Sequence, residues 1–305
     1  MKGPDRLRGC LLGLAVGDAV GTTVEFKPRG QFKPLSDMVG GGPFRLEPGQ
    51  WTDDTSMALC LATSLVERGA FDARDQMDRY CRWQHEGYLS SNGRCFDIGN
   101  TVTAALRRYQ ETDDPFAGSS DPQSAGNGSI MRLAPIPMFF FPDEDAVVEH
   151  AGESSRTTHA AAECVDACRL LGLILCRALA GQDHDELLSG VSGHTTSSEK
   201  IAAIARGDYA SKSESEIRGT GYVVESLEAA LWCFAGTDSF EAAILRAANL
   251  GDDADTTAAI CGQVAGAHYG EAGIPPQWLE RLAKKDDIAA LADRLCQHNS
   301  RTHAD

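Results

Sequence analysis

The chain has 305 residues, with 44 Asp and Glu residues against 28 Lys and Arg residues, and a formal net charge of −16. Such a chain lacks the clustered cations that bind a nucleic-acid polymer or an anionic membrane surface. With 42% hydrophobic and 24% charged residues, the composition is typical of a soluble globular protein with a sizeable core, and excludes a disordered or collagen-like chain.

The first predicted element covers residues 6–20 and includes an uncharged run, residues 9–17, that superficially resembles a signal peptide. The run is short and Asp18 interrupts it, so we expect a buried helix, no membrane insertion and a cytoplasmic protein. Ten cysteines without a CxxC pair predict buried free thiols. Cys164 and Cys168 lie one helical turn apart, but no second ligand pair accompanies them to bind zinc.

Helical periodicity with abundant alanine and leucine dominates the chain, whereas strand-like alternation is scarce. We therefore predict an all-α protein of roughly a dozen helices, and not a doubly wound sheet or a TIM barrel. In chain order, the predicted helices cover residues 6–20, 55–68, 72–87, 99–110, 145–152, 160–180, 197–206, 222–234, 239–248, 256–270, 276–282 and 286–298.

Three connections rich in Gly and Pro, residues 27–49, 113–128 and 207–221, could divide the chain into domains. Each is flanked by helical segments of similar composition, and no internal repeat appears. Because long loops in compact proteins tend to line functional sites, we expect one domain over residues 1–305 whose long loops gather at one end.

Two compact acidic segments precede predicted helices, residues 51–56 (WTDDTS) and 251–257 (GDDADTT). One interpretation is N-capping, since Asp and Thr satisfy free N–H groups at the positive end of a helix. A cap needs only one or two such residues, however, and neighbouring carboxylates repel each other unless a cation lies between them. Oxygen ligands without His or Cys select Mg²⁺, Mn²⁺ or Ca²⁺, and their number suggests two ions.

Several other polar residues are ambiguous from the pattern alone. Glu25 by itself would be a solvated loop carboxylate, and Asp97 with Asn100 forms a D-x-x-N pair typical of a helix cap. The glycine-rich turn at residues 126–129 could allow close backbone approach to a phosphate.

Three further residues would by default be structural. His159, which the pattern places at the start of the longest predicted helix, would cap it or lie in the core. Tyr222 would be a core residue. The apolar stretch from Met131 to Phe141 indicates core packing.

Six motifs follow one another along the chain: residues 9–19 (GCLLGLAVGDA), 51–55 (WTDDT), 97–101 (DIGNT), 126–132 (GNGSIMR), 158–159 (TH) and 251–256 (GDDADT). Their sequence and spacing resemble those of the ADP-ribosylglycohydrolases, in particular the bacterial branch that includes the dinitrogenase reductase-activating glycohydrolase. The resemblance implies a compact all-α fold with a two-metal centre, usually magnesium or manganese. It also implies cleavage of the bond between C1″ of ADP-ribose and an acceptor.

The same resemblance implies a role for each matching residue. Glu25 would be a gate or a water-orienting base, and Asp97 an acid/base or arginine-orienting group. Asp252 stands where many relatives have glycine and would cap the helix or support the ligands. The implied metal ligands are Thr52, Asp53, Asp54, Asp253, Asp255 and Thr256. The implied substrate-binding residues are Asn100, Gly126, Asn127, Gly128, Ser129, Met131, His159 and Tyr222, with the glycine-rich turn as pyrophosphate and ribose cradle and Tyr222 stacked on adenine.

We therefore expect a hydrolase that acts on an ADP-ribosylated protein, removes mono-ADP-ribose from arginine and releases ADP-ribose. Three alternatives stay open at this point. The linkage could involve serine, O-acetyl-ADP-ribose or a nucleobase, a choice that the loops at residues 27–49 and 113–125 would decide. The chain could instead be an ADP-ribose-binding or immunity protein that blocks a transferase, or a structural helical protein whose Asp clusters are caps.

Overall fold

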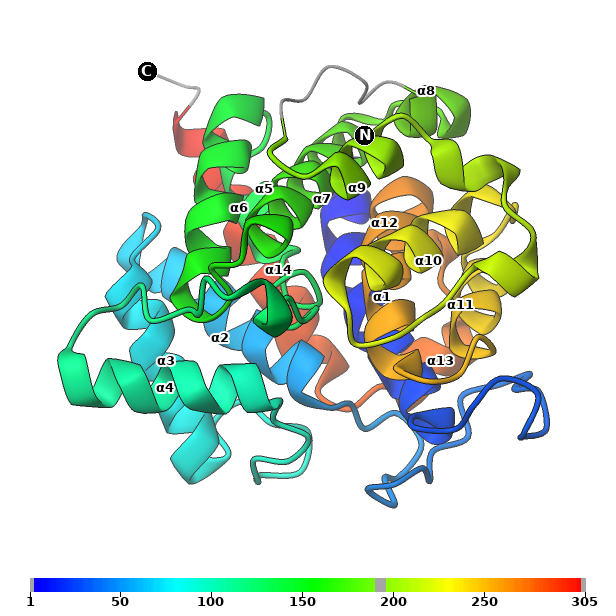
Figure 1. Ribbon diagram of the computed structural model, residues 1–305, viewed down its shortest axis with the longest axis horizontal. Coiled ribbons are helices and arrows are strands. Elements are labelled where there is room, and N and C mark those ends of the chain that lie inside the picture. The colour runs from blue at the N-terminus through cyan, green and yellow to red at the C-terminus, as the bar shows by residue number, and fades with distance from the viewer. Residues whose placement is uncertain (1–2, 190–195, 303–305) are drawn as a thin grey trace.

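The computed structural model describes residues 3–189 and 196–302, and within them the chain forms helices and loops but no strand (Figure 1). The all-α prediction is thereby confirmed. The α-helices are α1 (Gly3–Gly21), α2 (Asp53–Arg68), α3 (Ala73–Glu86), α4 (Asn100–Thr112), α5 (Pro135–Phe140), α6 (Glu144–Thr158), α7 (Ala162–Ala180), α8 (His184–Ser189), α9 (Glu199–Ala205), α10 (Val223–Ala235), α11 (Phe240–Ala248), α12 (Ala254–Tyr269), α13 (Pro276–Arg281) and α14 (Lys285–Thr302).

Each predicted helix overlaps one of these helices, but two short ones, α5 and α8, were missed. In α5 the prolines Pro135 and Pro137 look like helix breakers, yet proline is tolerated in a first turn, where the N–H has no helical partner. The expectation that His159 opens the longest helix is wrong. His159 is the C-terminal cap of α6, and α7 begins only at Ala162.

Helices α1 and α12 lie side by side at the centre of the molecule (Figure 1), and glycine makes their close approach possible. A Cβ atom added at Gly13 would lie 2.2 Å from the carbonyl oxygen of Gly262, and one at Gly17 would lie 2.1 Å from that of Ala258. The backbones are therefore in direct contact, with no room for a side chain. This contact brings Asp18 of α1 next to the first turn of α12.

The same α1 segment, extended to Val24, is long and apolar enough to cross a membrane by length and composition alone. In the structure, however, 89% of its apolar window is buried inside the protein. Burial of this kind is typical of the core helix of a globular fold. The expected buried helix is thus what the described residues show.

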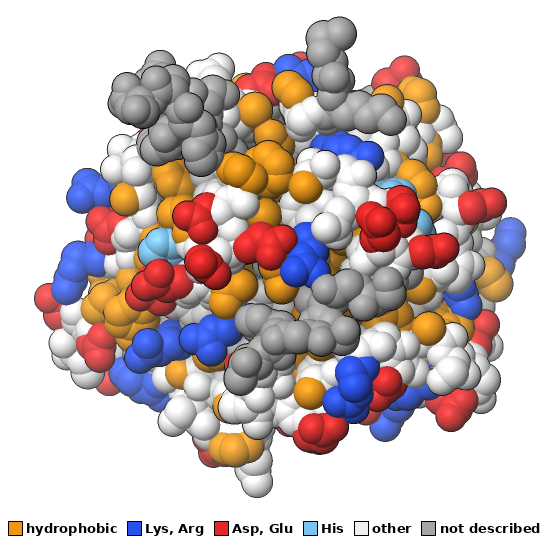
Figure 2. All heavy atoms as spheres, turned by 90° about the horizontal axis from the view of Figure 1, so that it is seen from above, with side chains coloured by type: hydrophobic (Ala, Val, Ile, Leu, Met, Phe, Trp, Pro, Cys, Tyr) orange, Lys and Arg blue, Asp and Glu red, His pale blue; other side chains and the backbone are white. Residues whose placement is uncertain are grey.

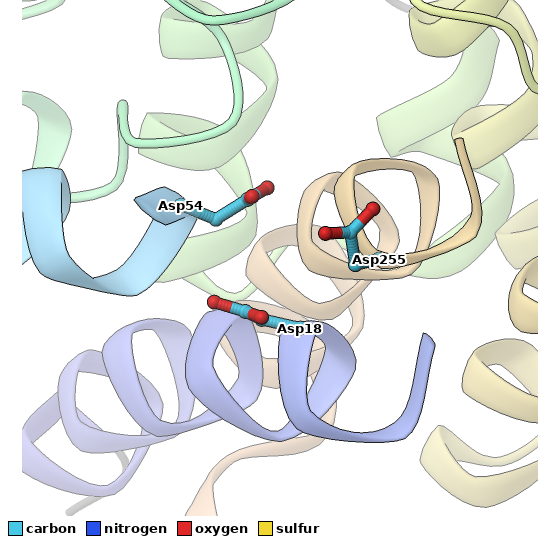
Figure 3. Close-up of side chains that lie close together, drawn as sticks. All are labelled: Asp18, Asp54 and Asp255. Carbon is cyan, nitrogen blue, oxygen red and sulfur yellow. The ribbon is translucent and has the colours of Figure 1, made fainter. Parts of the chain in front are cut away.

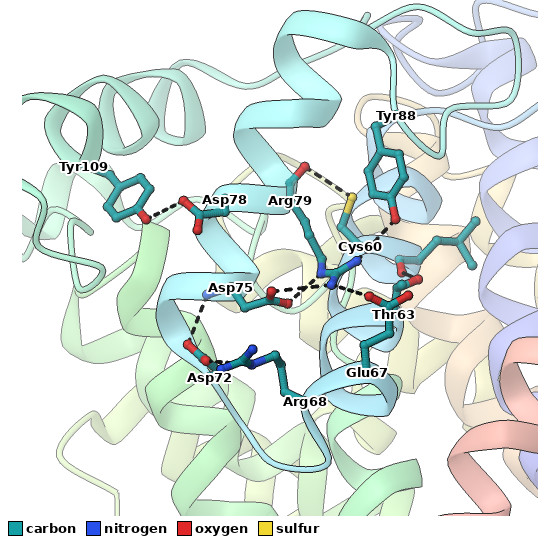
Figure 4. Close-up of polar contacts among 11 residues, drawn as sticks. Cys60, Thr63, Glu67, Arg68, Asp72, Asp75, Asp78, Arg79, Tyr88 and Tyr109 are labelled. Carbon is teal, nitrogen blue, oxygen red and sulfur yellow. Dashed lines mark hydrogen bonds and ion pairs between the residues drawn. The ribbon is translucent and has the colours of Figure 1, made fainter.

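A polar network joins α2 to α3 and fixes the orientation of α2 (Figure 4). Arg79, whose residue is 8% exposed, donates hydrogen bonds to Asp75 at 2.6 Å, to Glu67 at 2.7 Å and to the Tyr88 hydroxyl at 3.2 Å. Two carboxylates therefore balance this buried charge, as a stable buried ion pair requires. The network holds the helix whose N-terminus carries the first acidic segment.

The surface mixes charges of both signs, and the basic side chains visible in Figure 2 lie among acidic ones. All ten cysteines are free, and seven of them are buried. The prediction of buried free thiols is therefore confirmed for most of them. Cys164 and Cys168 are both fully buried in α7.

Candidate active site

A cavity of about 660 Å³ lies where the N-termini of α2, α4 and α12 meet. Its volume is in the range of small-molecule sites, and the three helix N-termini direct positive dipole ends toward it. The predicted site residues that line it are Glu25, Asp53, Asp97, Asn100, Gly126, Asn127, Gly128, Met131, His159, Asp253, Asp255 and Thr256.

Four predicted residues do not line the cavity. Thr52 and Asp54 are fully buried close to Asp255 of the cavity wall. Ser129 is 1% exposed and accepts a hydrogen bond from the Ser155 hydroxyl at 3.0 Å, so it packs inside the protein. Tyr222 is half-buried beside Gly221 of the lining.

Tyr222 is anchored by two charged side chains. Its hydroxyl donates to Glu163 at 2.5 Å and accepts from Lys200 at 2.7 Å. Its backbone pairs with Gly126 through an isolated antiparallel bridge. The ring is thereby held next to the glycine-rich turn.

Asp18, Asp54 and Asp255 converge from α1, α2 and α12 (Figure 3), each with one carboxylate oxygen within 4.8 Å of the others. All three are buried, and burial raises the pKa of Asp54 and Asp255 well above the usual value for aspartate. The Oδ1 atoms of Asp54 and Asp255 have no hydrogen-bond partner. A buried polar atom without a partner is costly, so these two oxygens fit a cation that the three helices would enclose.

The Thr52 hydroxyl adds a further oxygen to this arrangement. It lies 2.9 Å from Asp18 Oδ1 and 3.2 Å from both Asp54 Oδ2 and Asp255 Oδ2. A hydroxyl has one proton to donate, and Asp18 is the nearest acceptor. In the other two contacts, with Asp54 and Asp255, lone pairs of the hydroxyl oxygen face carboxylate oxygens and repel them. A hard divalent cation bound by these oxygens would offset the repulsion.

Asp18 was not predicted as a site residue, although it lies in one of the quoted motifs. Its Oδ1 accepts from the Thr52 N–H at 2.8 Å and the Thr52 hydroxyl at 2.9 Å. Its Oδ2 accepts from the Thr55 N–H at 3.1 Å and the Thr55 hydroxyl at 2.6 Å. Both oxygens of Asp18 are thus used in orienting the start of α2, whereas Oδ1 of Asp54 has no partner. A charged residue at the end of a glycine-rich apolar run was the signal in the sequence.

These contacts bear on the capping interpretation of the acidic segments. The N-cap residues Thr52 and Asp253 make no side-chain capping hydrogen bond. At the start of α2, the N–H groups of the N-cap residue Thr52 and of Thr55 in the first turn donate to Asp18, which lies outside the segment. The capping interpretation therefore does not account for either segment.

A second acidic group lies at the cavity surface, where Glu25, Asp97 and Asp255 each place an oxygen within 4.8 Å of the others. Burial raises the pKa of Glu25 to about 10, with repulsion from Asp97 and Asp253 adding to it. Burial likewise raises the pKa of Asp97 to about 7. Because Asp255 belongs to both groups, the two acidic groups are adjacent and share a ligand.

The second acidic segment is positioned by the glycine-rich turn. The Asn127 side chain donates to Asp253 at 2.8 Å and to the Ser226 hydroxyl at 3.1 Å. Asp252 has φ 54, a left-handed conformation that glycine adopts without strain. That conformation is a physical reason for the glycine that the family resemblance implies at this position.

His159 packs against the same turn, because a Cβ at Gly128 would lie 2.8 Å from its Cε1 atom. The hydroxyl of Thr158 accepts a hydrogen bond from Arg132 at 2.7 Å and lies 2.8 Å from His159 Nδ1. Since Arg132 can only donate, the Thr158 proton goes to Nδ1, and His159 carries its own proton on Nε2. Burial and the charge of Arg132 lower the pKa of His159 to about 3, so this Nε2–H is a neutral donor at the cavity.

The fold and the site together define an all-α protein with buried groups of carboxylates that could hold a metal ion at a ligand-sized cavity. This chain belongs to the ADP-ribosylglycohydrolase family, because the family's sequence model matches residues 2–304. The resemblance seen in the sequence is thereby confirmed. Family membership also makes the chain a hydrolase.

Individual relatives agree with this assignment. The chain is 48% identical over 291 residues to "ADP-ribosylarginine hydrolase Tri1" of Pseudomonas putida (strain GB-1), covering 95% of this chain and 78% of that protein. It is 34% identical over 292 residues to "ADP-ribosyl-[dinitrogen reductase] glycohydrolase" of Rhodospirillum rubrum, covering 93% and 94%. A solved structure titled "ADP-ribosylglycohydrolase-related protein complex" superposes with a TM-score of 0.87 at 42% identity, covering 98% of this chain and 99% of that chain. The bacterial branch expected from the motifs is therefore represented among the relatives.

Proposed function

We propose that this chain cleaves the C1″ glycosidic bond of ADP-ribose and removes mono-ADP-ribose from modified arginine side chains of proteins. The observation that carries the proposal is the pair of acidic groups that share Asp255 at the wall of a ligand-sized cavity. The printed name of the Pseudomonas putida relative supports arginine as the acceptor.

We assign the cofactor as two divalent cations, Mg²⁺ or Mn²⁺, because the ligand atoms are oxygens only. The unpartnered Oδ1 atoms of Asp54 and Asp255 support this assignment. When bound, the cations would polarise ribose hydroxyls and a water and offset negative charge. The residues that would hold them are Thr52, Asp53, Asp54, Asp253, Asp255 and Thr256.

The remaining residues bind the substrate and move protons. With the cations bound, nearby positive charge would lower the pKa of Glu25, and its carboxylate would then orient the attacking water and accept its proton. Asp97 would orient the arginine and donate a proton to its nitrogen as the C1″–N bond breaks through an oxocarbenium-like transition state. Water thus supplies the hydroxyl on C1″, and the products are ADP-ribose and unmodified arginine.

The ADP portion would occupy the part of the cavity formed by the glycine-rich turn and its neighbours. The backbone N–H groups of the turn and the Nε2–H of His159 are suited to diphosphate and ribose oxygens, which explains how an acidic protein could hold an anion. Tyr222 is held where it could stack on adenine. The residues assigned to substrate binding are Asn100, Gly126, Asn127, Gly128, Ser129, Met131, His159 and Tyr222.

The setting of this activity is also part of the proposal. We infer a single catalytic domain over residues 1–305, acting in the cytoplasm on ADP-ribosylated proteins, without binding nucleic-acid polymers or inserting into membranes. The family match over residues 2–304 supports the single domain. Burial of α1 supports a location away from the bilayer.

The test is release of free ADP-ribose from an arginine-ADP-ribosylated protein in Mg²⁺ or Mn²⁺. We expect EDTA and Asp255→Ala each to abolish release. Asp286→Ala removes a carboxylate whose side chain is 94% exposed, and it should have no effect. If ADP-ribose were released only from a serine, O-acetyl or nucleobase linkage, that linkage and not arginine would be the substrate. Binding of ADP-ribose without release from any linkage would instead support an ADP-ribose-binding or immunity protein.

A further inference from the structure

Three phenylalanine rings gather at the mouth of the cavity, and we call them the aromatic rim: Phe26, Phe44 and Phe96. Phe26 and Phe44 line the cavity. The centroid of Phe44 lies 6.5 Å from that of Phe26 and 5.3 Å from that of Phe96. Phe26 and Phe44 lie in the long connection before α2, and Phe96 lies in the connection between α3 and α4, so the tertiary structure assembles the rim.

Phe26 is both exposed and held in an uncommon conformation. It is 65% exposed, so its ring gains little from burial. Its φ is 60, a left-handed value that is a marked outlier for a bulky residue. Two backbone hydrogen bonds hold it there, from Phe26 N–H to the Asp252 carbonyl at 2.7 Å and from Asp252 N–H to the Lys27 carbonyl at 2.9 Å. Backbone strain that is not offset by burial of the side chain is typical of a residue that contacts a ligand.

The rim lies beside the carboxylates at which the glycosidic bond would break. Phe26 follows Glu25, Phe96 precedes Asp97, and both carboxylates line the same cavity. Since C1″ must reach these carboxylates, the acceptor bonded to C1″ must pass the solvent-exposed mouth that the rim forms. Flat aromatic faces next to carboxylates suit a planar cation, which can stack on a ring while its charge is balanced.

We propose that the aromatic rim is the acceptor subsite and that it binds the guanidinium group of the ADP-ribosylated arginine, with Phe26 as the principal contact. This assignment rests on the proposed function and names what would distinguish arginine from serine as acceptor, since serine has neither a planar group nor a charge.

The rim is tested with Phe26→Ala, assayed on an arginine-linked and a serine-linked ADP-ribosyl peptide, together with the Kd for free ADP-ribose. We expect KM for the arginine-linked peptide to rise about tenfold, the upper part of the range for a cation over an aromatic ring. The Kd for ADP-ribose and any turnover of the serine-linked peptide should not change. Phe26→Tyr keeps the ring and should restore KM. Val39→Ala is the matched control, since Val39 is 52% exposed in the same connection as Phe26 but does not line the cavity.

A second measurement does not depend on turnover. Agmatine, a guanidinium on a four-carbon chain that ends in an ammonium group, is titrated into the ADP-ribose complex with Mg²⁺ and followed by saturation-transfer NMR. The comparison is (4-aminobutyl)urea, which has the same chain and ammonium group but an uncharged planar end. Wild-type protein should bind agmatine but not (4-aminobutyl)urea, and Phe26→Ala should bind agmatine about tenfold more weakly.

The outcomes separate the two proposals. An unchanged KM for the arginine-linked peptide in Phe26→Ala, or an equal loss of ADP-ribose affinity, would overturn the acceptor subsite. If wild-type protein releases ADP-ribose from no linkage, the proposed function is wrong, and the agmatine titration alone tests the acceptor subsite. Equal agmatine binding by wild type and Phe26→Ala, or no binding by wild type, would then show that the aromatic rim does not bind a guanidinium group.

Discussion

The backbone contact between α1 and α12 makes a quantitative prediction for Gly17→Ala. The added methyl group would lie 2.1 Å from the Ala258 carbonyl oxygen, whereas real Cβ contacts essentially never fall below 3.0 Å. The helices must therefore separate by roughly 0.9 Å. Overpacking of this kind costs about 1–3 kcal/mol. The clash is with backbone and cannot relax by a rotamer change, so the cost should lie at the upper end. Alanine favours a helix over glycine by up to about 1 kcal/mol, and this offsets part of the cost. We therefore expect a net loss of about 2 kcal/mol in the free energy of unfolding.

The same displacement should weaken cation binding. Gly17 adjoins Asp18, which orients the start of α2 and with it Asp54, and Ala258 lies one helical turn after Asp255. Separating α1 from α12 therefore moves Asp54 away from Asp255. Metal sites tolerate about 0.2 Å in ligand distance, and a displacement several times larger should reduce Mn²⁺ affinity at least about tenfold. Urea denaturation and calorimetric Mn²⁺ titration measure the two effects.

Gly3→Ala is the matched control. Gly3 lies on the same helix as Gly17, and a Cβ atom added there would meet no other atom within 4 Å. It should leave both the stability and the affinity for Mn²⁺ nearly unchanged. If Gly17→Ala behaved like Gly3→Ala in both measurements, direct backbone contact between α1 and α12 would not be what holds the carboxylates together.

Two further predictions concern protons. Burial raises the pKa of Asp97 to about 7 and of Glu25 to about 10, so in the metal-free protein the native state retains protons that the unfolded chain has already released. The free energy of unfolding in EDTA should fall as pH rises from about 6.5 to 8, an interval above the usual pKa of histidine. Saturating Mg²⁺ should reverse the fall, and a metal-free stability that rises over this interval would contradict the reasoning. Thr158→Val removes the hydroxyl between Arg132 and His159, so the ¹⁵N spectrum of His159 should change from one Nε2–H tautomer to a mixture. An unchanged spectrum would show that the hydrogen-bond chain does not set the tautomer.

Local features of the sequence were enough to predict most of the fold. Apolar residues recur with helical period and glycine or proline marks the ends, so the long helices could be predicted from neighbouring residues alone. The prediction failed where distant contacts decide. Helix α6 continues past Gly152 to Thr158 because its last turns pack against other helices, with Gln76 donating to the Ser154 and Thr157 hydroxyls at 3.1 and 3.2 Å.

For the candidate site too, some features follow from the local sequence and others only from the tertiary structure. The acidic segments, the glycine-rich turn and the order of the motifs are local patterns, and they determined the family and the type of ligand atom from sequence alone. Which atoms are left free is a tertiary property. Only the packing of α1 against α12 and α2 places Asp18 where it accepts from the N–H groups of Thr52 and Thr55, while the Oδ1 atoms of Asp54 and Asp255 stay without a partner. Likewise, only the meeting of the connection before α2 with the connection between α3 and α4 creates the aromatic rim, because residues far apart in the chain carry no periodic signal of their contact.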